Sequence, residues 1–156
     1  MNHDWRHLPA PARPIAAAAT AAVIAAQAHD GDALDAAVAD LAALDPARSG
    51  LILGTTTRLL LERANPDGLD GDAVREVLER CVRSAAGWQP DTDPHVMLYL
   101  LAGALGVLDE DAAPAPKPEV LARHAALLLA ELLHGGPPRE AFTAALTEIE
   151  RTQLHD

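Results

Sequence analysis

The chain of 156 residues is poor in aromatic side chains, with two Trp, one Tyr and one Phe, or 3% of the total. It has a single cysteine, Cys81, so it cannot form an internal disulfide. Val, Ile and Thr are sparse and scattered, and no segment shows the apolar–polar alternation of a half-buried strand. These absences exclude a disulfide scaffold and argue against a β-sheet. Cys81 falls on the apolar stripe of a predicted helix, where we expect it to be a small buried side chain.

Basic residues are also few. Lys and Arg total 12 against 23 Asp and Glu, which gives a net charge of −11, and Lys117 is the only lysine. Proteins that bind nucleic acids usually carry a basic patch, and this chain has no cluster of three or more Arg. We therefore expect no direct binding of DNA or RNA. The acidity favours solubility and would suit a basic protein partner.

Long hydrophobic runs are missing as well. The uncharged stretch at residues 96–108 is shorter than the roughly 20 residues that a transmembrane helix needs, so we expect no membrane span. Arg6 and Arg13 precede an apolar run at residues 15–26, and residues 1–28 thus have the outline of a secretory signal peptide. The run is mostly Ala and only weakly hydrophobic. We expect it to be retained as the first helix of a cytoplasmic protein, with secretion as the alternative.

What the chain does have is alanine, its most frequent residue and the best helix former. Asp caps, prolines and glycine breaks divide the sequence into helical segments. Residues 1–13 are predicted to form an arm and residues 14–156 a single helical domain. The helices are expected at 14–28, from Asp32 onward, and at 46–64, 70–86, 94–109, 118–134 and 138–152.

The uncharged stretch supplies the expected centre of the fold. Asp93-Pro94 in front of it is a helix start, and a helix that is apolar on every side belongs inside a bundle. We predict an all-α domain of about seven helices, in antiparallel pairs around a central apolar helix at 94–109. Similar helix starts at Gly31 and Gly71 lie 40 residues apart, so a helical-pair repeat resembling an α-solenoid is the alternative architecture.

Two glycines interrupt this central segment. Gly103 and Gly106 share a face with Tyr99, although glycine inside a helix costs about 1 kcal/mol relative to alanine. We expect another helix to approach closely there, with Gly50 and Gly54 providing the matching small-residue face. On this interpretation Gly103→Leu would overpack the core.

The alternative explanation of the glycines is a cavity for a small apolar ligand. Candidate pocket residues are then Tyr99, Gly103 and Gly106, with Thr55 and Thr56 as a polar spot on the neighbouring helix. Threonine in a helix can instead bond the carbonyl four residues earlier, which satisfies its hydroxyl without any ligand.

Two motifs contain residue types that commonly bind metal ions. Glu131 and His134 form an E-x-x-H, the spacing found in di-iron bundles, but a second such motif and further inward carboxylates are lacking. His3 and His7 lie four residues apart in the predicted arm, with no evident third ligand. We therefore expect no metal and no cofactor, with these four residues as the only candidates. His124 lies among apolar residues and is expected to be a core histidine with a hydrogen-bond partner.

Trp88 is the main candidate for an interface. It lies in a Gly/Pro-flanked loop, and exposed Trp is a favoured anchor of protein interfaces; the alternative is a ring folded over the end of the bundle. No catalytic motif is evident, so the leading functional hypothesis is a non-catalytic protein-interaction or scaffold domain. A helical binder of a small apolar ligand is the first alternative, and an enzyme whose polar residues meet only in three dimensions is the second.

Overall fold

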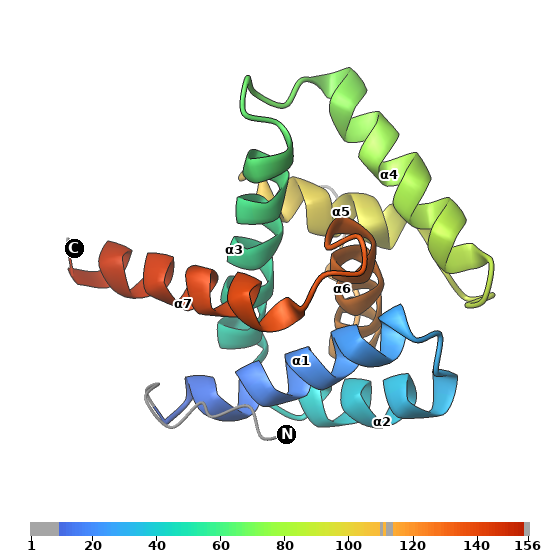
Figure 1. Ribbon diagram of the computed structural model, residues 1–156, viewed down its shortest axis with the longest axis vertical. Coiled ribbons are helices and arrows are strands. Elements are labelled where there is room, and N and C mark those ends of the chain that lie inside the picture. The colour runs from blue at the N-terminus through green and yellow to red at the C-terminus, as the bar shows by residue number, and fades with distance from the viewer. Residues whose placement is uncertain (1–9, 110, 112–113, 155–156) are drawn as a thin grey trace.

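Seven α-helices and no strands make up the described residues of the computed structural model, which are 10–109, 111 and 114–154 (Figure 1). They form a single all-α domain. In chain order they are α1 (Ala12–Gln27), α2 (Gly31–Ala42), α3 (Pro46–Ala64), α4 (Gly71–Ala86), α5 (Pro94–Ala104), α6 (Pro118–Leu132) and α7 (Pro138–Leu154).

Aspartate side chains start four of the helices. Asp45, Asp70 and Asp93 cap α3, α4 and α5, each accepting a hydrogen bond from a backbone N–H of the first turn. The cap of α2 is Asp30, whose carboxylate accepts from the N–H of Ala33 at 3.1 Å. The sequence prediction of Asp32 is wrong by two residues, because the extended backbone that a cap requires lies at Asp30.

The centre of the fold is α6, not the predicted segment at 94–109. Figure 1 shows α6 in the middle of the molecule, and it packs against α1, α2, α3, α4 and α5. Its buried side chains include the uninterrupted run Leu127–Leu129. In α5 only Val96, Met97 and Leu101 are buried, while Leu98 is 46% exposed. The uncharged stretch therefore covers one side of α6 and is itself partly open to solvent.

The predicted helix at 94–109 also ends early, at Ala104. Gly106 follows the last turn with a φ of +75°, a left-handed conformation that glycine adopts without strain. The Val107 N–H donates to the Ala102 carbonyl at 2.9 Å, and the Gly106 N–H donates to the Gly103 carbonyl at 3.2 Å. These two bonds form a Schellman motif, so Gly106 terminates the helix and does not belong to its face.

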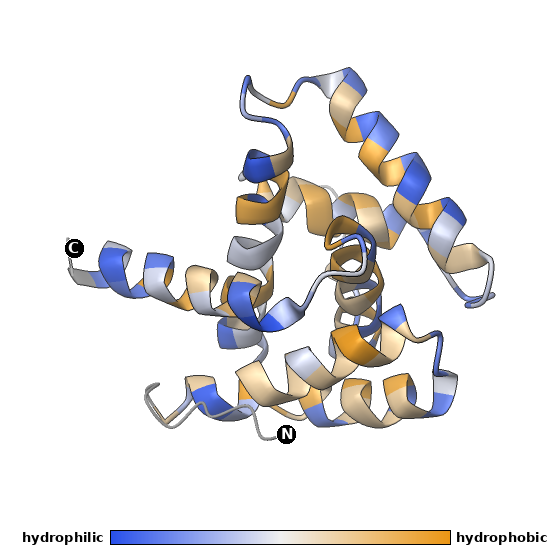
Figure 2. Ribbon diagram, in the orientation of Figure 1, coloured by the Kyte–Doolittle hydropathy of each residue, from blue (hydrophilic) through white to orange (hydrophobic). Residues whose placement is uncertain are grey.

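The outer helices do not follow the predicted pairing throughout. α1 and α2 pack side by side, but α7 packs on α3 and α1 and extends outward at the C-terminus (Figure 1). α4 lies at the other side and contacts α5 and α6. Figure 2 shows the apolar residues concentrated in the inner helices, with polar residues along α4 and the outer half of α7.

Partly exposed ion pairs cross three of these contacts. Arg80 of α4 lies 3.3 Å from Glu131 of α6, and Arg58 of α3 lies 3.6 Å from Glu148 of α7. Arg123 of α6 pairs with an aspartate of α2. Pairs of this kind contribute little to stability individually, so apolar burial holds the fold together.

Among the described helices, none has the length and hydrophobicity to cross a lipid bilayer.

Candidate functional site

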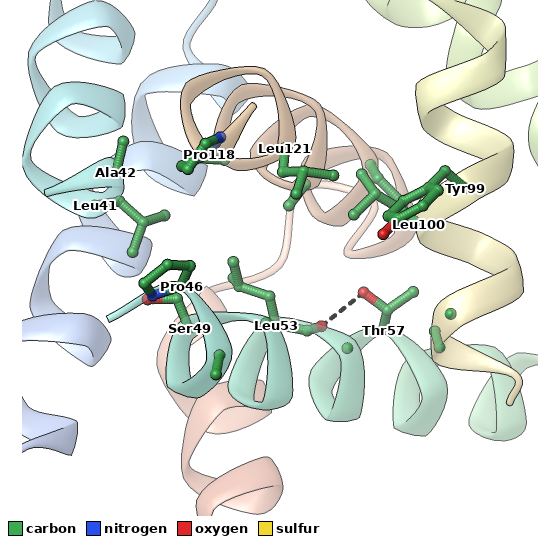
Figure 3. Close-up of a pocket in the computed structure, with 18 of the residues that line it drawn as sticks. Leu41, Ala42, Pro46, Ser49, Leu53, Thr57, Tyr99, Leu100, Pro118 and Leu121 are labelled. Carbon is green, nitrogen blue, oxygen red and sulfur yellow. Dashed lines mark hydrogen bonds between the residues drawn. The ribbon is translucent and has the colours of Figure 1, made fainter. Parts of the chain in front are cut away.

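A cavity of about 440 Å³ lies between α2, α3, α5 and α6 (Figure 3). Leu41 and Ala42 of α2 stand at one end, and Tyr99 and Leu100 of α5 stand at the other. Leu121 of α6 and residues of α3 form the walls between them. This volume falls within the range of about 300–1,000 Å³ typical of small-molecule sites.

The α3 wall follows the helical repeat. The lining residues recur three or four positions apart, so they share one face of the helix: Pro46, Ala47, Ser49, Gly50, Leu53, Gly54 and Thr57. Leu53 gives this wall an apolar centre, while the two glycines leave it hollow. An added Cβ at Gly50 or Gly54 would meet no heavy atom within 4 Å.

The α5 wall is hollowed in the same way. Tyr99 and Gly103 lie four residues apart on one face, and both line the cavity. An added Cβ at Gly103 would approach only the Leu108 Cδ2 atom, at 3.8 Å, which is ordinary contact. The expected close approach of helices is therefore wrong. The glycines of α3 and α5 leave space between their helices, which is the alternative that the sequence allowed.

Of the predicted pocket residues, the structure brings together Tyr99 and Gly103. Thr55, Thr56 and Gly106 do not line the cavity. Thr56 is buried, and its hydroxyl donates to the Ile52 carbonyl at 2.7 Å. Thr57, and not Thr55 or Thr56, is the threonine of this helix that lines the cavity. It lies three residues after Gly54 and seven after Gly50, on the same helical face. That spacing was present in the sequence and would have selected Thr57.

Three hydroxyl groups belong to an otherwise apolar and uncharged lining. Thr57 Oγ1 donates to the Leu53 carbonyl at 2.8 Å. Ser49 is buried, and its Oγ has no hydrogen-bond partner within the described part of the chain. The Tyr99 ring reaches in from α5 on the side of Thr57, and no hydrogen bond joins its hydroxyl to another described residue. None of the lining residues is Asp, Glu, Lys, Arg or His.

Comparison with known proteins does not help to interpret this cavity. No family model, curated protein or solved structure matches this chain. The function must therefore be inferred from the chain's own geometry. Ligand pockets in proteins are concave, mostly apolar and supplied with a few polar groups, and the cavity described above has all three properties.

The metal candidates are not brought together. Glu131 lies on α6 beside Arg80, and His134 lies beyond the helix end with a φ of +50° and an exposed side chain. His3 and His7 lie outside the described residues. Within the part of the chain that the structure describes, no group of three or more His, Cys, Asp or Glu side chains could hold a metal ion.

Trp88 lines a smaller, polar recess of about 130 Å³ at the end of the bundle. Its ring is half-buried and stacks on His29, with centroids 4.7 Å apart and planes 9° from parallel. Ser84 and Glu131 also line this recess, but Glu131 pairs with Arg80. Among the described residues, no hydrogen bond joins Ser84 to His29, whereas an activated serine needs its base within reach.

A third hollow of about 570 Å³ lies where α7 crosses α3 and the start of α1. Its lining includes Leu51, which is 49% exposed, and Ile149. Arg48 and Glu150 add charge to the same groove. It is the more polar of the two large hollows, and α7 forms one of its walls.

Proposed function

We propose that this protein binds a small apolar ligand in the cavity between α2, α3, α5 and α6. The observation that carries this proposal is a hollow of about 440 Å³ whose walls are apolar and whose facing helices place glycines on either side of it. The hollow is partly open to solvent, since Gly50 and Gly103 of its lining are exposed. An occupant would remove the apolar walls from water, which favours binding.

The volume of the cavity indicates the size of ligand that would fill it. A cavity of about 150 Å³ lined by Leu, Ile and Phe is large enough to bind benzene. The present space is therefore suited to a molecule larger than a single aromatic ring. Leu53, Leu121 and Leu128 would supply hydrophobic contact, which is worth about 25 cal/mol per Å² of apolar surface removed from water.

The single tyrosine of the chain makes a direct test possible. Tyr99 lines the cavity, and Phe142, the only phenylalanine, is buried in the core away from it. Protein labelled with fluorotyrosine therefore gives a single ¹⁹F signal from Tyr99, and protein labelled with fluorophenylalanine gives a single signal from Phe142. We expect titration with 1-octanol to shift the Tyr99 signal saturably and to leave the Phe142 signal in place.

A variant that fills the space is the matched control. Gly103→Leu introduces a side chain beside the cavity where a Cβ meets only ordinary contacts, so the fold should be retained. We expect it to abolish the shift of the Tyr99 signal. A Tyr99 signal that never saturates up to the solubility limit of 1-octanol would refute the proposal.

The protein-interaction hypothesis is the second candidate, and the groove beneath α7 favours it. Leu51 presents an exposed apolar side chain there, beside Arg48 and Glu150. A partner with an apolar anchor and basic flanks would suit this groove and the net charge of −11. The test is capture of a partner from native lysate by the wild type and by Leu51→Arg. Recovery that is equal for both proteins would count against the groove.

A further inference from the structure

Among the described residues that line the cavity, Tyr99 carries the one hydroxyl that a bound molecule can reach and bond. Its side chain is half-buried, makes no hydrogen bond to another described residue, and keeps accessible surface at its oxygen. The other two hydroxyls of the lining differ from it. The Ser49 oxygen has almost no accessible surface, and Thr57 is buried and gives its proton to the Leu53 carbonyl. The phenol is therefore the side-chain donor that this lining offers to a ligand.

The phenol lies at one end of an apolar stretch of the lining. Figure 3 shows the Tyr99 ring at the α5 end of the cavity, with its oxygen on the side of Thr57. Leu53 and Leu121 lie between this end and Leu41 at the α2 end. A ligand whose polar atom meets the phenol would therefore lay its hydrocarbon part along these leucines toward α2.

Filling the cavity changes the surroundings of this hydroxyl. In the unliganded protein, water can bond the accessible phenol. A pure hydrocarbon would displace that water and leave the hydroxyl without a partner, which is unfavourable. A ligand with an acceptor oxygen at the same place would replace the lost bond. Sites that offer a hydrogen bond to a ligand discriminate in this way against analogues that lack the matching atom.

Charge narrows the class of acceptor. None of the described lining residues is charged, so an ionised head group would have no counter-charge there. We infer that the ligand is a largely hydrocarbon molecule with an uncharged acceptor oxygen, such as that of a ketone or an ester, which accepts a hydrogen bond from Tyr99. This inference rests on the proposed ligand-binding function and adds to it the class of the ligand and its orientation.

The test removes the oxygen from the protein and from the ligand in turn. Tyr99→Phe loses only the phenol oxygen, and 2-methyl-1-octene has a methylene group where 2-octanone has its carbonyl oxygen. The ¹⁹F signal at position 99 reports binding in both proteins, from fluorotyrosine in the wild type and from fluorophenylalanine in the variant. The quantity compared is the ratio of the dissociation constants of the two ligands within one protein, so that the choice of label affects both ligands alike.

We expect 2-octanone to lose about five-fold in affinity relative to 2-methyl-1-octene in Tyr99→Phe, the effect of one hydrogen bond. The carbonyl ¹³C signal of bound 2-octanone gives a second measurement. A hydrogen bond to the carbonyl oxygen moves this signal downfield from its position in a hydrocarbon solvent. We expect the downfield shift in the wild type and its loss in Tyr99→Phe.

Thr56→Val is the matched control. Thr56 is buried on α3 beside the lining, donates to the Ile52 carbonyl and does not line the cavity. This variant also loses one hydroxyl but keeps Tyr99, so the ratio should stay as in the wild type. Tyr99→Phe keeps the aromatic ring and should fold normally, and an unchanged Phe142 signal checks that it does.

The outcomes separate the two proposals. An equal ratio in wild type and Tyr99→Phe would overturn the inference, and so would a wild-type carbonyl signal at its hydrocarbon position. An equally large change in Thr56→Val would overturn it as well, because the effect would then not depend on the phenol. In each of these cases saturable binding of 2-methyl-1-octene would leave the proposed function standing. If neither ligand binds, both proposals fail.

Discussion

The backbone N–H of Asp93 donates a hydrogen bond to Nε2 of His124 across 2.9 Å. Nδ1 of the same ring lies 2.8 Å from the Val120 carbonyl, which can only accept. The proton of the neutral imidazole is therefore on Nδ1, and Nε2 is the acceptor. Asp93 is the cap of α5, so this buried histidine ties the start of α5 to the central helix α6.

Loss of that acceptor should weaken the attachment of α5. In His124→Leu the Asp93 N–H has no partner and the ring is replaced by a side chain without polar atoms. We expect the free energy of unfolding to fall by about 1–3 kcal/mol, the usual cost of an unsatisfied buried polar group. Urea denaturation measures the change. The control is His95→Ala, because the side chain of His95 is almost fully exposed, and it should have little effect. Equal stability of both variants would contradict the tie.

The helix boundaries could largely be predicted from the sequence because they depend on neighbouring residues. Asp45, Asp70 and Asp93 cap helices through bonds to residues two or three positions away, and the prolines after Asp45 and Asp93 fix the same turns. The expected burial of Cys81 and His124 is also confirmed. Each of these features is visible within one or two helical turns of sequence.

Which helix lies at the centre could not be predicted in the same way. The segments at 94–108 and 118–132 are both rich in leucine and alanine, and composition alone favours the uncharged one. The choice is made by contacts between distant segments, which bury the Leu127–Leu129 run on several sides and leave Leu98 partly exposed. The same long-range packing decides that the glycines of α3 and α5 border a cavity and not a helix contact.

Two glycines of the same segment should respond oppositely to alanine. Gly103 is helical, and an added Cβ would meet only Leu108 Cδ2 at 3.8 Å. Gly103→Ala should therefore raise the free energy of unfolding by roughly 0.5–1 kcal/mol through its better helix propensity. Gly106 has a φ of +75°, so Gly106→Ala should lower it by about 1–2 kcal/mol. Chemical denaturation of both variants checks the pair. Strong destabilisation of Gly103→Ala would instead support the close helix contact that the sequence first indicated.

The stack of Trp88 on His29 should contribute to stability, since the two rings lie 4.7 Å apart at the end of the bundle. We expect Trp88→Ala to lower the free energy of unfolding by about 1–3 kcal/mol, because it removes both apolar burial and the ring contact. His29 has a φ of +53°, so His29→Asn is the suitable second variant, as asparagine tolerates that conformation.

A double-mutant cycle of these two substitutions isolates the stack itself. The expected coupling between Trp88 and His29 is about 0.5–1.5 kcal/mol. Strictly additive effects would show that the rings do not support each other. An unchanged melting temperature in Trp88→Ala would leave the ring available as the interface anchor that the sequence suggested.

Cys81 should remain an unreactive thiol until the protein unfolds. Burial first and the nearby Glu131 carboxylate second raise the pKa of this thiol, Arg80 opposes them, and together they bring it from 9.0 to about 12. Between these two values the folded protein keeps the proton while the unfolded chain releases it. Stability is therefore lost as the pH rises from 9.0 toward 12, and this loss should be absent in Cys81→Ala.

The measurement is the free energy of unfolding of wild type and Cys81→Ala at pH 8 and at pH 10.5. The difference between the two proteins should shift against the wild type at the higher pH. Because the two proteins differ only at residue 81, this comparison isolates the contribution of the thiol. At pH 8 a thiol reagent should react with the wild type only at the rate at which the chain opens, since the folded protein has almost no thiolate at Cys81. Rapid reaction under native conditions would place the sulfur at the surface and remove the reason for its raised pKa.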